Sequence, residues 1–190
     1  MRRPLALAAL ALSLALSTAA CGGDEDSDLP RVGSTPSASP TPSATPSWSA
    51  TAQPERPQDE QSEEGARAFT EFVADTVLYV MATGDAPALS SIANLSSCEQ
   101  CRVWDDNFTS GKIVERTIGT GPATYALADS PTVTEDVFYK VPLTMDIPPG
   151  RTVNKNSGDR KKIGAAKDLP FTADIKWEDD QWLLMRYEMG

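Results

Sequence analysis

The apolar residues of this chain change their spacing near Gly111, from the period of a helix to that of a strand. Between Ser62 and Gly84 they recur every three or four residues and form one helical stripe: Ala66, Phe69, Val73, Val77, Val80 and Met81. Within residues 135–147 apolar and polar side chains alternate, which is typical of an antiparallel strand with one face on a core. Helices followed by a run of strands predict an α+β fold.

Local signals predict where the helices begin and end. Ser62 can cap the first helix, whose first turn is acidic, and Gly84 ends it. Asp85 can cap a second short helix that contains Pro87, Leu89 and Ile92. A third helix is expected from near Cys98 to Gly111. In an α+β fold the helices pack on one face of an antiparallel sheet, which is the arrangement that we expect here.

The alternating segment is the clearest strand. One face carries Val137, Tyr139, Val141, Leu143, Met145 and Ile147. Pro142 lies on the other face, and because it has no N–H it predicts an unpaired edge or a bulge. Further strands are expected at residues 112–118, 123–128, 171–177 and 182–189. The polar turn Glu178–Gln181 predicts that the last two form a hairpin.

Residues 1–20 predict a secretion signal. Arg2 and Arg3 precede an apolar run of about a dozen residues, whereas a spanning helix needs about 20. Thr18, Ala19 and Ala20 then precede Cys21, an arrangement that resembles the lipobox of bacterial lipoproteins. That resemblance implies a diacylglycerol thioether on Cys21 and an acyl chain such as palmitate, which anchor the chain to the outer face of the cytoplasmic membrane. The alternative is an ordinary secreted protein whose Cys21 is free or paired.

Residues 21–61 predict a disordered linker. They begin with an acidic collar and continue with Pro, Ser, Thr and Ala, so they lack the apolar side chains that offset the entropy of ordering. The hydroxyl-rich part could also carry O-linked sugars. We therefore expect one domain at residues 62–190, large enough for a single core.

The charge pattern excludes one class of partner and suggests another. The chain has a net charge of −10, which disfavours nucleic-acid binding. Residues 148–169 break this trend with two acidic side chains and six basic ones: Arg151, Lys155, Arg160, Lys161, Lys162 and Lys167. Two interpretations stay open: a solvated loop between strands, and a contact with anionic lipid, wall polymer or an acidic envelope protein.

Cys98 and Cys101 form a CxxC motif. If Cys21 carries a lipid, these are the two remaining cysteines. In an extracytoplasmic, oxidising environment such a pair indicates a structural disulfide. A thiol–disulfide protein is the alternative, and it requires a lowered thiolate pKa. A zinc site requires four ligands, and the sequence has no second Cys or His pair.

Three stretches together resemble an uncharacterised family of actinobacterial lipoproteins with a domain of unknown function: ATGDAPAL after the first helix, SCEQC, and KWEDDQWLL in the last hairpin. The order of elements is similar to the nuclear transport factor 2-like fold. That resemblance implies a curved sheet wrapped around helices as a cone with a cavity. Proteins with this fold include ketosteroid isomerases, polyketide cyclases and non-catalytic domains, so the fold does not decide an activity.

The residues favour binding over catalysis. The chain has no histidine, and acidic groups such as Asp105, Asp106 and Glu178–Asp180 lie in polar stretches. Tyr79, Tyr125 and Tyr139 are either core residues or hydrogen-bond donors into a cavity. We therefore expect no catalytic residue, cofactor or metal, and a binding or interaction module at the cell envelope. An enzyme or carrier that uses the cavity, and a thiol–disulfide protein, are the alternatives.

Overall fold

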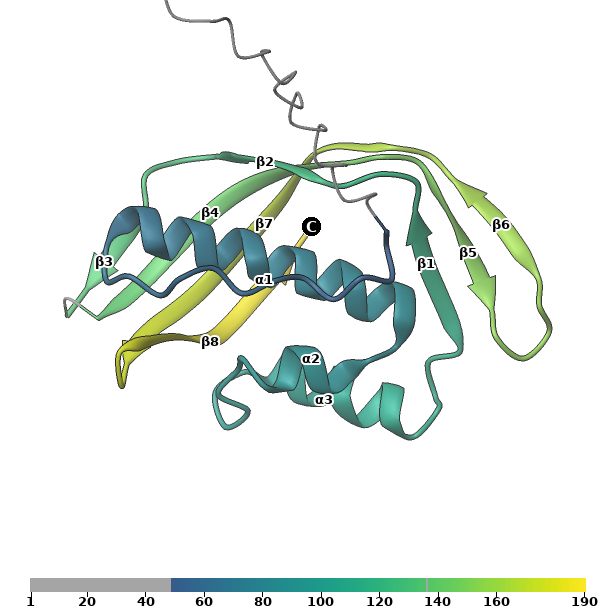
Figure 1. The fold of residues 1–190 in the computed structure, drawn as a ribbon, viewed down its shortest axis with the longest axis horizontal. Helices are drawn as coiled ribbons and strands as arrows, with labels where there is room; N and C mark the ends of the chain where they lie inside the picture. The colour runs from purple at the N-terminus through teal and green to yellow at the C-terminus, as the bar shows by residue number, and fades with distance from the viewer. Residues whose placement is uncertain (1–48, 136) are drawn as a thin grey trace, which may run out of the picture. The chain divides into compact units, whose positions relative to one another are not determined.

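The computed structural model describes residues 49–135 and 137–190, all of which belong to the unit Ala44–Gly190 (Figure 1). The buried hydrophobic residues of this unit have sequence numbers from Ala66 to Tyr187. The unit therefore has a hydrophobic core of its own. The predicted signal, Cys21 and the linker before residue 49 lie outside the described residues.

The three predicted helices are present: α1 (Glu63–Thr83), α2 (Ala86–Ser90) and α3 (Glu99–Thr109). Ser62 caps α1, because its hydroxyl accepts the N–H of Gly65 at 3.0 Å. Gly84 ends α1 in a left-handed conformation with φ 81°. Asp85 precedes α2 but makes no side-chain cap; instead its carboxylate accepts the Tyr79 hydroxyl.

The main sheet is antiparallel, with strands in the order β2-β4-β7-β8 and β3 beside β4. Its strands are β2 (Thr124–Leu127), β3 (Thr132–Thr134), β4 (Phe138–Ile147), β7 (Ala166–Glu178) and β8 (Gln181–Met189). The helix α1 crosses this sheet (Figure 1). The β7–β8 hairpin turns at Asp179 and Asp180, both with positive φ, as the polar turn predicts. The α+β class with helices on an antiparallel sheet is therefore confirmed.

The core is formed by the stripe of α1 and the inner face of the sheet. The α1 residues Phe69, Val73, Val77 and Val80 are fully buried. Opposite them are the fully or almost fully buried Val141, Leu143, Met145, Phe171, Ala173, Ile175, Trp182 and Leu184. Each large side chain of this kind contributes roughly 1.5–3 kcal/mol by burial. The apolar residues with the helical period and those with the strand period therefore pack against each other in one interface.

Pro142 lies at an interruption of the neighbouring strand. The β2 strand ends at Leu127 and β3 starts at Thr132, and both pair with β4. The carbonyl of Pro142 accepts the N–H of Ala128 at 3.1 Å, and in a strand the nitrogen of a residue points to the same side as its carbonyl. The missing N–H therefore faces the break between β2 and β3, which confirms the predicted unpaired edge.

The basic segment forms strands, so the solvated-loop interpretation is wrong. Residues 148–169 contain β5 (Gly150–Asn154), β6 (Arg160–Ile163) and the start of β7. With β1 (Glu115–Gly119) they make a second antiparallel sheet in the order β1-β5-β6. These strands carry polar side chains on both faces, so they show no alternation that the sequence analysis could detect.

Arg116 connects β1 to the ends of two helices. Its guanidinium donates to the carbonyl of Thr83 at 3.1 Å and to that of Ile113 at 2.9 Å. It also lies 5.0 Å from the centre of the Phe108 ring. Gly84 has a positive φ, which favours glycine, and a Cβ there would lie 2.3 Å from this guanidinium and force it to move.

Residues 49–61 differ from the predicted disordered linker, because they lie against the folded unit. Arg56 donates to the carbonyl of Trp182 at 2.8 Å and forms an ion pair with Asp59 at 2.9 Å. Asp59 accepts the backbone N–H of Trp182, and the Glu60 carbonyl accepts its indole N–H at 2.9 Å. Composition gives no sign of this segment's attachment, because the attachment depends on polar and backbone groups. We call residues 56–60 the clamp.

Replacing Asp59 with alanine should lower the free energy of unfolding by about 1–2 kcal/mol at pH 7, because the N–H of Trp182 and the Arg56 guanidinium lose their acceptor. Burial raises the pKa of Asp59, but the hydrogen bonds from Arg56 and Trp182 outweigh it and hold the pKa below its ordinary 3.8. The advantage of the wild type should thus be complete above about pH 4 and disappear as pH falls further.

Urea unfolding of both proteins at several pH values checks this prediction. Glu55→Ala is the matched control, because Glu55 is exposed in the same segment. Equal losses in the two variants would contradict a specific role of Asp59.

Candidate functional site

The candidate site is a pocket of about 430 Å³ beside α1. Its walls are Leu78 and Ala82 of α1, residues of segment 49–54, and apolar residues near the strand ends, among them Ala123, Pro148 and Ile163. The volume falls within the range of small-molecule sites, which are mostly apolar and carry few polar groups. The pocket can therefore accommodate a small organic molecule.

A second stripe of α1 forms one wall of the pocket. Asp75, Leu78, Tyr79 and Ala82 line it, and their spacing of three and four residues places them on one side of the helix. The second sheet contributes Thr117 and Gly119 of β1 together with Ile163 of β6. Gly119 and Ile163 both pair with Gly150, so β5 brings them to the same level of the sheet.

A carboxyl group and a phenol meet at the edge of the pocket. The Tyr125 hydroxyl donates to the Asp75 carboxylate and so joins β2 to α1. Burial raises the pKa of Asp75, the bond from Tyr125 opposes the shift, and the charge of Glu71 adds to it. Burial and the neighbouring Asp75 charge raise the pKa of Tyr125, which keeps the phenol a donor. The pair is thus a polar group held in a mostly apolar wall.

The sequence did not decide whether Tyr79, Tyr125 and Tyr139 belong to the core or face a cavity. In the structure Tyr79 and Tyr125 lie at the pocket, and Tyr139 lies in the core. Tyr79 lines the pocket and donates to Asp85 at 2.9 Å. Tyr139 packs edge-on against Trp182, with ring centres 5.0 Å apart, and belongs to the core. Tyr125 binds Asp75, which the sequence analysis did not single out. A lone polar residue on an amphipathic helix carries no signal that it faces a pocket.

Two observations apply to residues 49–135 and 137–190. No group of three or more His, Cys, Asp or Glu side chains is arranged there to hold a metal ion. No helix among these residues combines the length and the apolar character that a membrane crossing requires.

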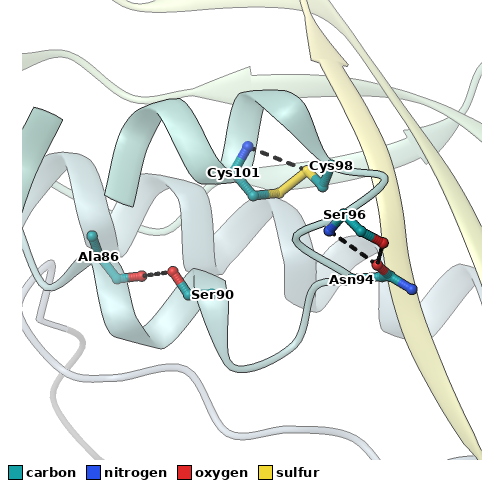
Figure 2. The surroundings of a disulfide bond; sticks show 6 residues. All are labelled: Ala86, Ser90, Asn94, Ser96, Cys98 and Cys101. Carbon is teal, nitrogen blue, oxygen red and sulfur yellow. Dashed lines mark hydrogen bonds between the residues drawn. A yellow bond between two sulfur atoms is a disulfide. The ribbon is translucent and has the colours of Figure 1, made fainter. Parts of the chain in front are cut away.

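Cys98 and Cys101 form a disulfide at the start of α3, as Figure 2 shows. Both cysteines are buried, and the Cys98 sulfur accepts the N–H of Cys101 at 3.3 Å. The preceding loop is bound to β8, because Asn94 donates its N–H to the carbonyl of Leu184 at 2.8 Å. Buried sulfurs favour the structural interpretation over the redox one, which requires an accessible thiolate.

Replacing both cysteines with serine should lower the free energy of unfolding by about 2 kcal/mol, the loop-closure entropy of so short a ring. Urea unfolding of residues 44–190 with and without the substitutions measures this. In the same unreduced protein, an alkylating reagent should leave the intact mass unchanged. Rapid alkylation of both thiols without reductant would contradict the disulfide.

The structure brings five of the six predicted basic residues onto the β5–β6 hairpin. Arg151 and Lys162 pair across the strands, and all five are exposed: Arg151, Lys155, Arg160, Lys161 and Lys162. Lys167 is separate, because it lies on β7 and forms an ion pair with Asp146. The contact of this hairpin with an anionic partner stays a prediction.

The comparisons with known proteins add a family and two distant structures. Residues 50–188 match a protein family described as "Family of unknown function (DUF6318)". No curated protein matches the chain. The intermembrane space region of chloroplast protein ARC6 is similar at 12% identity and a TM-score of 0.39, over 58% of this chain and 82% of its own. A solved protein named Rd1NTF2_05, carrying five substitutions, is similar at 12% identity and a TM-score of 0.37, over 67% and 97%.

The name of the second structure contains that of the fold expected from the sequence, nuclear transport factor 2. Both likenesses are too distant to support an argument about the pocket. The predicted membership of a family of unknown function is confirmed, whereas actinobacterial origin and lipid modification stay predictions.

Proposed function

The chain belongs to the DUF6318 family of unknown function, and from its geometry we propose that its domain is a non-catalytic module that binds a small apolar ligand. The observation that supports this is the pocket beside α1, with its mostly apolar walls and the Asp75 carboxyl group, which Tyr125 holds in place. Such a composition is typical of sites that hold a ligand by burial and orient it with a few polar groups.

The hydrogen bonds of the two nearby phenols favour binding over catalysis. Catalysis by proton transfer requires an acid or base directed at the reacting group. Tyr125 donates to Asp75, and Tyr79 donates to Asp85, so each phenol proton is already engaged with a carboxylate. An enzyme that uses the pocket is the alternative function, and turnover of a bound ligand would establish it.

The substitution Ala123→Phe tests the pocket, because Ala123 lines it and a phenyl group would fill part of its volume. The neutral dye N-phenyl-1-naphthylamine should bind residues 44–190 with increased fluorescence, and Ala123→Phe should weaken its binding at least about tenfold. Fluorescence titration measures both effects.

Ala126→Phe is the matched control. Ala126 lies three residues further along, is exposed and does not line the pocket, so the same change there should leave dye binding intact. Melting curves establish that both variants fold. Absent dye binding, or equal loss in the two variants, would contradict a ligand site in this pocket.

We also propose that the module is held at the outer face of the cytoplasmic membrane by a lipid on Cys21. The short apolar leader and the small residues before Cys21 support this, together with the linker that follows. The exposed β5–β6 hairpin would then be available to anionic lipid or wall polymer.

Membrane fractionation of expressing bacteria checks the anchor. The wild-type chain should enter the detergent phase, and Cys21→Ser should move it to the aqueous phase. Cys98→Ser, which leaves the lipobox intact, is the control. Detergent partitioning that survives Cys21→Ser would contradict a lipid on this residue.

A further inference from the structure

The charged residues of the pocket wall indicate which kind of ligand the pocket can bind. Asp75 is the only carboxylate among the lining residues, and no Lys or Arg lines the pocket. Arg67, the only basic residue of α1, lies about two turns before Asp75 and already forms an ion pair with Glu71 at 2.8 Å. An anionic group on a ligand would therefore find no positive charge among the lining residues. It would instead lie near the carboxyl group of Asp75.

Asp75 keeps capacity for a further hydrogen bond. A carboxylate has about four acceptor positions on its two oxygens, and Tyr125 uses one of them. The group is partly withdrawn from water, which makes an added donor more favourable and an added anion less so. Burial also raises the pKa of Asp75, which means that its charged form is disfavoured in the free protein. A second donor would relieve this unfavourable burial.

We propose that the pocket selects apolar molecules that end in a hydrogen-bond donor, an amine above all or a hydroxyl, and that it rejects those that end in a carboxylate. In the bound state the donor lies against Asp75, and the apolar part lies along Leu78 and Ala82 toward Pro148. This inference rests on the proposed function, because it assigns a ligand class to the same pocket.

Displacement of the bound dye by three decyl compounds tests the selection. Decylamine, 1-decanol and decanoate share one apolar chain and differ at the end, and each is used below its micelle concentration at pH 7.5. We expect the inhibition constants to rise in that order, with decylamine at least about tenfold tighter than decanoate. Asp75→Asn should reduce this ratio to below about threefold. Because Asp75 lines the pocket, the dye affinity of this variant is measured first, and each inhibition constant is calculated from it. Asp105→Asn, on α3 and away from the pocket, should keep the wild-type ratio.

The outcomes separate the two proposals. Dye binding with equal displacement by all three compounds, or an unchanged ratio in Asp75→Asn, would overturn the selection and leave the ligand site standing. No dye binding would overturn both. If residues 44–190 bind the dye and the full chain does not, the preceding segment of this chain occupies the pocket, which would overturn a small-molecule ligand.

Discussion

The packing of α1 on the main sheet is the constraint on which the other features depend. Its buried stripe, from Phe69 to Val80, contacts a sheet face of fully buried residues, and together they form most of the core. The helix is fixed at its start by Ser62 and at its end by Gly84 and Arg116. Because both ends are fixed, the next stripe of the helix, with Asp75 and Leu78, has a defined direction. That stripe forms the pocket wall.

The sequence predicts the features whose signals are local. A cap, a helical period, a glycine and an alternating strand each occupy few residues, so α1, β4 and the β7–β8 hairpin follow from single-sequence patterns. The sequence also indicates a break at Pro142. These features are sufficient to predict the fold class and the residues that form the core.

The features that the sequence did not predict depend on distant or polar contacts. Tyr125 and Asp75 are 50 residues apart, so their pairing appears only when β2 lies against α1. The β5–β6 hairpin is polar on both faces and lacks an alternating pattern. Residues 56–60 attach through charges and backbone groups to Trp182. The pocket is therefore a product of tertiary structure, and its residues could not be listed in advance.

The order of pocket wall and clamp along the chain has a mechanical consequence. Residues 49–54 line the pocket, and the clamp at residues 56–60 follows them. Tension applied to the chain before residue 49 would therefore load the pocket wall first, while the clamp shields α1 and the core from the force. If the pocket holds a ligand, as proposed above, a pull that detaches residues 49–54 would open the site while α1 and the core stay folded. If the chain is also anchored through Cys21, as proposed above, ligand retention would depend on the tension between the domain and its anchor.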